Sequence, residues 1–133
     1  MKNDIQNRDD LLLLVQRFYE KLLNDQTISY LFTDIAKIDL DHHLDILVDF
    51  WEMVLFDGRN YKKNAMQPHM LLHEQSPITK AHFSTWLTYF KTTVDELFEG
   101  ETAFMAKERA TSVATIMQIK IAQLNQEKQL KGD

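Results

Sequence analysis

The stretch that decides the fold is TKAHFSTWLTYFKTTVDELFEG, residues 79–100. Its large apolar side chains recur every three or four residues, at Phe83, Trp86, Phe90, Val94 and Leu97. This is the period of a helix that buries one face. Thr79 can cap such a helix at its start, and the helix is expected to end before Gly100. We therefore predict one long amphipathic helix here.

The same period recurs in three other segments, which are residues 10–24, 40–56 and 101–124. Asp9 and Asp10 place acidic charge where the first helix has the positive end of its dipole. Asp39 can cap the second helix, and Asp57-Gly58 can end it. The pattern predicts four substantial helices.

Shorter helical pieces are expected between the long ones, at residues 28–32 and after Pro68, which is well placed to open a helix that reaches His73. The chain has 133 residues but only three glycines and two prolines. So few turn-forming residues are typical of long helices, whereas a β-sandwich or barrel needs many more. We predict an all-α fold in a single domain, 1–133, with a core over about residues 8–124 and a polar tail, 125–133, that frays.

Composition excludes several classes of function. Because the chain has no cysteine, it can form no disulfide, thiolate metal site or iron–sulfur cluster. Its formal net charge of -5 disfavours nucleic-acid partners and anionic membranes, which attract Lys- and Arg-rich surfaces. No apolar run approaches the roughly 20 residues of a membrane span. We expect a cytoplasmic protein that binds neither nucleic acid nor membrane.

Five histidines are the candidate metal ligands. His43 lies on the apolar stripe of its predicted helix, where it is either a core residue or part of a site. His73 ends a short apolar turn, and a neutral imidazole is the commonest metal ligand. His69 precedes it by four residues, so the two can share a helix face and chelate a non-haem metal. His42 and His82 are expected at the surface.

Large aromatic side chains on the apolar faces are candidates for either core packing or a ligand pocket. They are Tyr19, Phe32, Trp51 and Trp86. A buried Tyr or Trp needs a partner for its polar atom. A tyrosine hydroxyl and an indole N–H that face one cavity can therefore donate hydrogen bonds to a small bound ligand.

An ordered set of short motifs is more specific than any one of them. The chain carries Phe18-Tyr19-Glu20-Lys21, Leu31-Phe32, His43 eight residues before Trp51, Pro68 to His73, and Phe83 to Trp86-Leu87. In this order and spacing, residues 8–122 resemble a truncated haemoglobin of the third group. The interval of thirteen from His73 to Trp86 is similar to the family's interval from its proximal His to the Trp of the next helix. The absence of a Gly-Gly pair departs from the first two groups and agrees with the third.

The resemblance implies a globin-like, truncated two-over-two helical sandwich that holds haem b. It implies that His73 is the proximal iron ligand, and that Tyr19, His43 and Trp86 line the distal side where the ligand binds. The side chains implied to contact the cofactor are Phe32, His43, Leu47, Phe50, Met70, Leu72, His73 and Trp86. Donors from Tyr19 and Trp86 are expected to slow O2 release.

Three functions follow from these readings. The first is a haem globin that binds O2 or NO for redox or NO chemistry, not bulk transport. It would act as a monomer or weak dimer, with an unidentified reductase as partner. Whether it turns over as an NO dioxygenase or a peroxidase-like enzyme is left open. The second is a cofactor-free helical interaction module. The third is a non-haem metal protein that uses His69, His73 and a carboxylate.

Overall fold

The computed structural model describes residues 1–61 and 66–130, with the side chains of 66 and 67 excepted. Its elements are six α-helices and one π-helical turn: α1 (Arg8–Leu23), α2 (Gln26–Tyr30), η1 (Leu31–Ile35), α3 (Leu40–Phe56), α4 (Met66–Gln75), α5 (Lys80–Leu97) and α6 (Glu101–Leu130). No strand occurs in these ranges. The predicted all-helical class is confirmed.

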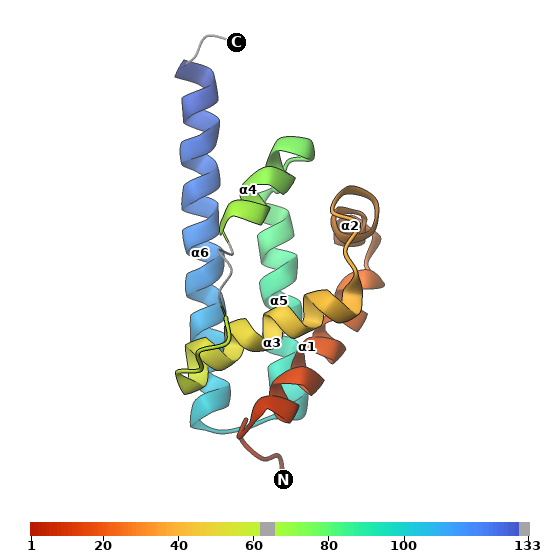
Figure 1. The fold of residues 1–133 in the computed structure, drawn as a ribbon, viewed down its shortest axis with the longest axis vertical. Coiled ribbons are helices and arrows are strands. Elements are labelled where there is room, and N and C mark those ends of the chain that lie inside the picture. Colours follow the sequence, from red (N-terminus) through yellow and green to blue (C-terminus); the bar gives the residue numbers. More distant parts are fainter. Residues whose placement is uncertain (62–65, 131–133) are drawn as a thin grey trace.

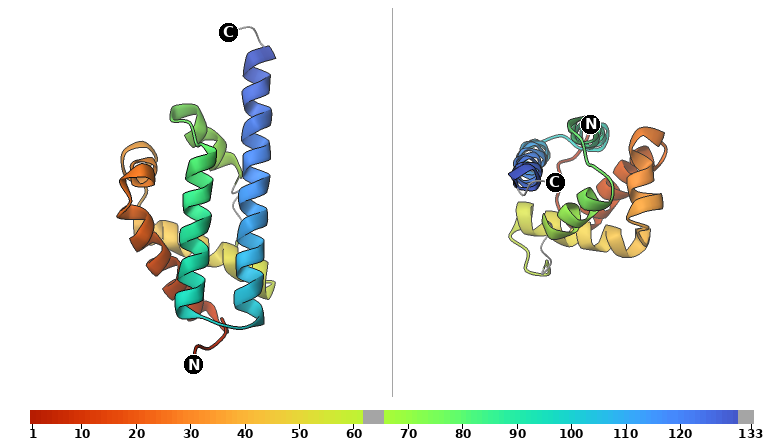
Figure 2. Two further views of the ribbon diagram at one scale, coloured as in Figure 1. Left: turned by 180° about the vertical axis from the view of Figure 1, so that it is seen from behind. Right: turned by 90° about the horizontal axis from the view of Figure 1, so that it is seen from above.

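The four long helices form two packed pairs. α5 and α6 run side by side, α1 packs against α3, and the pairs join through α1–α5 and α3–α6 contacts. Figure 1 shows α3 crossing the α5–α6 pair, with α4 and α2 towards the upper end and the α5–α6 turn at the lower end near the N-terminus. The view from behind in Figure 2 shows the same arrangement. This is the predicted two-over-two sandwich.

The main core lies where α1 meets α3, α5 and α6. It contains fully buried apolar side chains from each helix, including Leu11, Leu14, Val48, Phe90, Val94 and Ala106. α6 contributes Ala103, Ala106 and Ala110 to this core and Ala114 to a second apolar cluster, a spacing that puts small side chains on one face. Small side chains let α6 approach its neighbours closely.

A three-ring stack crosses this core. Phe90 of α5 stacks on Trp51 of α3, with ring centroids 4.8 Å apart and planes 16° from parallel. Trp86, one turn earlier on α5, also stacks on Phe90 at 5.8 Å and 12°. The stack links α3 to α5 through three large apolar surfaces.

Local capping explains where most helices begin and end. The Thr79 side chain accepts a hydrogen bond from the backbone of His82, and the His82 ring accepts one from Thr79, which completes a capping box at the start of α5. Asp57 adopts a left-handed conformation, φ 59°, directly after α3. α1 starts earlier than expected, because Asn7 is its cap and Asp9 lies in its first turn.

The packed structure begins before residue 8, because Ile5 is buried in the main core. α6 continues through Leu130, but its residues 125–130 are all exposed. Fraying of this tail stays a prediction, and residues 131–133 lie outside the described ranges. Gln, Glu, Lys and Leu favour a helix, which outweighs the polarity of this segment. None of the helices in the described ranges is apolar over a length that would span a bilayer.

Candidate functional site

A hydrogen-bonded pair of polar side chains lies between α1 and α3. The hydroxyl of Tyr19, on α1, and Nε2 of His43, on α3, are 2.8 Å apart. Tyr19 is only 4% exposed, and the packing of α1 on α3 brings the two residues together. The structure thus joins two of the predicted distal residues.

Burial keeps both members of the pair uncharged at neutral pH. It raises the pKa of Tyr19 above its usual value. Burial also lowers the pKa of His43, to about 4, with further lowering from the charges of His69 and His42. The Tyr19 hydroxyl therefore retains a proton that it can donate to a ligand.

Two aromatic rings contact the tyrosine of this pair. Phe18 and Phe32 both contact the Tyr19 ring edge-on, each at 5.4 Å between centroids. Phe32 comes from η1, where the π-helical turn follows directly on α2. Trp86 lies one ring further away and meets Phe18 at 5.7 Å. The third predicted distal residue is thus adjacent to the pair and does not touch it in a ring contact.

The side chains predicted to contact a cofactor share one property, which is partial burial. They pack against the main core or against a second apolar cluster under α4 while keeping part of their surface exposed; they are Phe32, Leu47, Phe50, Met70, Leu72 and Trp86. They come from η1, α3, α4 and α5. Apolar surface of this kind, beside a Tyr–His pair, suits a flat apolar ligand with a polarisable centre. The donor set and its surroundings fit a haem.

His73 differs from the other predicted slot residues, because it is buried and 7% exposed. Its Nδ1 accepts a 3.0 Å hydrogen bond from the backbone N–H of Ile78. Its Nε2 lies 3.0 Å from Oδ1 of Asn125, on α6. His73 thus links the end of α4 to α6 and to the segment before α5. Its role as iron ligand stays a prediction.

The remaining histidines occupy different surroundings. His69 is exposed on the first half of α4 and lies close enough to His43 for its charge to act there. His42 is exposed, as predicted. His82 was expected at the surface but is half-buried, because its Nε2 lies 3.0 Å from the Tyr30 hydroxyl while its other nitrogen caps α5.

Sequence reasoning missed Asn125 and Tyr30 as partners of histidines. Each lies 52 residues from its histidine. No local pattern carries a signal for such a pair.

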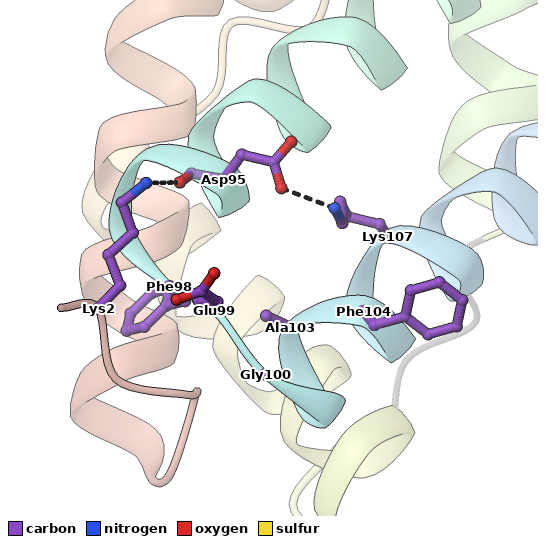
Figure 3. Close-up of a pocket in the computed structure, with 8 residues that line it drawn as sticks. All are labelled: Lys2, Asp95, Phe98, Glu99, Gly100, Ala103, Phe104 and Lys107. Atoms are coloured by element: carbon purple, nitrogen blue, oxygen red, sulfur yellow. Dashed lines mark hydrogen bonds and ion pairs between the residues drawn. The ribbon is translucent and has the colours of Figure 1, made fainter.

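The described ranges offer no second candidate site. In them, no group of three or more His, Asp, Glu or Cys residues can hold a metal ion, which leaves the interpretation as a non-haem metal protein without support. A surface hollow of about 400 Å³ lies at the α5–α6 turn, and Figure 3 shows the residues that line it. Both lysines there have partners, since Lys2 donates to the backbone carbonyl of Asp95 and Lys107 pairs with the Asp95 carboxylate.

Comparisons with known proteins cover nearly the whole chain. The family described as bacterial-like globin matches residues 4–123. A group 3 truncated haemoglobin of Campylobacter jejuni is 24% identical over 121 residues, which cover 89% of this chain and 93% of that protein. The crystal structure of a group III truncated haemoglobin from Campylobacter jejuni has a similar fold, with a TM-score of 0.80 and 22% identity, over 91% of this chain and 95% of that one.

Proposed function

This chain belongs to the bacterial-like globin family, and from that premise we propose that it binds haem b and through it O2 or another diatomic ligand such as NO. One observation carries the proposal: the Tyr19–His43 pair, whose tyrosine ring contacts Phe18 and Phe32, lies beside half-buried apolar side chains from four elements. Haem iron supplies a reversible binding position for a diatomic ligand. The family match and the fold similarity span nearly the whole chain, which supports a single globin domain.

The apolar side chains would hold the flat faces of the cofactor. Phe32 and Leu47 reach the proposed slot from η1 and α3, Leu72 from α4 and Trp86 from α5. Each keeps exposed area that a bound cofactor would cover, which contributes about 25 cal/mol for every Å² of apolar surface removed from water. A histidine on α4 would bind the iron.

The distal side would favour a ligand that becomes negatively polarised. Tyr19 keeps its proton because burial raises its pKa, and His43 holds the hydroxyl in place. A hydrogen bond to a partly charged partner is worth about 1–3 kcal/mol, so donors from Tyr19 and Trp86 would slow release by one to four powers of ten, roughly. Slow release suits redox or NO chemistry better than transport. A reductase partner and turnover belong to the same proposal.

Haem titration of the purified protein tests the proposal. We expect an intense Soret band that saturates at one haem per chain. Leu47→Asp would place a charge among the slot residues and should prevent saturation, while Met53→Asp, on the exposed side of the same helix, should leave it intact. Absence of a Soret band would favour the cofactor-free module, and bound metal without porphyrin would favour the non-haem reading.

A further inference from the structure

His69 and His73 lie one turn apart on α4, and their side chains are used very differently. Resting on the proposed function, we propose that His69 binds the haem iron, whereas His73 is a structural residue that ties α4 to α6 and to the segment before α5. The inference concerns which of this chain's two α4 histidines contacts the cofactor.

The hydrogen bonds of His73 already assign its tautomer. Because Nδ1 accepts from the Ile78 N–H, the proton of the neutral ring is on Nε2, which donates to Asn125 Oδ1. Binding iron through Nε2 requires the opposite tautomer, with the proton on Nδ1. That proton would then face the Ile78 N–H, and two donors would oppose each other in a buried place. The amide would lose its partner and Asn125 its donor.

The location of His73 agrees with a structural role. Ile78, its backbone partner, belongs to the second apolar cluster, together with Phe83, Ala114 and Met117 of α5 and α6. His73 is almost fully buried beside it, whereas the predicted slot residues Phe32, Leu47 and Leu72 keep exposed surface. The interval to Trp86 that favoured His73 crosses the connection between α4 and α5, and 24% identity does not fix the length of that connection.

His69 lies where the slot residues are. α4 packs against η1, which carries Phe32, and Phe32 contacts the Tyr19 ring. The His69 ring is exposed on the first half of α4. From there His69 can present an imidazole nitrogen to a cofactor next to Phe32.

A pair of matched glutamine variants tests the assignment. His73→Gln can still accept from the Ile78 amide and donate to Asn125, but neither glutamine is a neutral imidazole ligand. The readouts are the absorption spectrum of the ferrous protein, haem transfer to an excess of an apo-globin acceptor, and urea unfolding of the haem-free chain.

We expect His69→Gln to lose the histidine-ligated spectrum and to release haem at least about tenfold faster, with unfolding of the haem-free chain unchanged. His73→Gln should keep the wild-type spectrum. Asn125→Ala and His73→Ala should lower the urea midpoint of the haem-free chain, because they remove the tie to α6, and Asn125→Ala should leave the ligation spectrum as it is.

Two outcomes would overturn the inference while the proposed function stands. One is a wild-type spectrum in His69→Gln, and the other is loss of histidine ligation in His73→Gln. A wild-type protein that binds no haem at all would overturn both the inference and the proposed function. Haem titration of the wild-type protein is therefore measured before any variant is made.

Discussion

Two regions of the molecule satisfy their polar groups in different ways. At the lower end, the N-terminal segment closes the α5–α6 turn through bonds to backbone: the Asp4 carboxylate accepts from the N–H groups of Thr102 and Ala103, at 2.9 and 2.8 Å. Between α1 and α3, Tyr19 and His43 bond to each other. A bond to backbone fixes the chain, whereas a bond between two side chains can be exchanged for one to a ligand. Stability and ligand chemistry are thus placed in different regions.

The largest loss of stability is expected from Gly100→Ala at the lower end. Gly100 has φ +146°, and an added Cβ would lie 2.5 Å from Cγ of Asp4. Backbone strain and displacement of Asp4 should lower the free energy of unfolding by about 2–4 kcal/mol. Urea denaturation measures this. Gly58→Ala is the control, because Gly58 does not have a positive φ and its added Cβ would meet only the side chain of Glu52. An equal loss there would contradict the explanation.

Asp4→Asn should have the next largest effect and one that depends on pH. Burial raises the pKa of Asp4, but hydrogen bonds from Thr102, Ala103 and Ile5 outweigh it and hold the pKa below 3.8. Such a carboxylate stabilises the fold above pH 3.8, and the contribution is lost as pH falls through the native pKa. We expect a loss of about 1–2 kcal/mol at pH 7 that shrinks near pH 3. Exposed Asp9→Asn is the matched control.

Tyr19→Phe tests the other region, the Tyr19–His43 pair. It should raise the O2 dissociation rate at least about tenfold, because a donor to the polarised ligand is lost. Stopped-flow ligand replacement measures the rate, and the unfolding free energy should change by less than that of Asp4→Asn. An unchanged dissociation rate would contradict the role of Tyr19 as a donor. Tyr30→Phe is the control, because the Tyr30 hydroxyl bonds to His82 instead of His43.

The smallest effect is expected from Lys107→Ala, again at the lower end. Lys107 pairs with Asp95 at 2.6 Å, as Figure 3 shows, but the Asp95 side chain is 62% exposed. Exposed ion pairs contribute about 0–1 kcal/mol. A loss in urea unfolding as large as that of Gly100→Ala would mean that surface charge, and not the Asp4 cap, closes this end.

Features that depend on neighbours in sequence could be predicted. Thr79 caps α5 because its partner is three residues away, and Asp57 ends α3 through its own backbone conformation. The spacing of apolar side chains predicted all four long helices. The ordered set of Tyr19, Phe32 and His43 predicted a cluster that the fold brings together.

Features that depend on distant partners could not be predicted. Asp4 caps α6 from 98 residues away, so the start of the packed structure was placed too late. Asn125 lies in the segment predicted to be a polar tail, and only the fold brings it beside His73. The same long-range contact is what separates the two α4 histidines, which local pattern treats alike.

The three-ring stack has an optical consequence. Trp51 and Trp86 are the only tryptophans of the chain, and both stack on Phe90. All indole emission therefore originates from one place in the interior. Because Trp86 is also a proposed slot residue, a bound chromophore there would quench both rings by energy transfer. The chain thus carries its own fluorescent reporter of occupancy, with no label to attach.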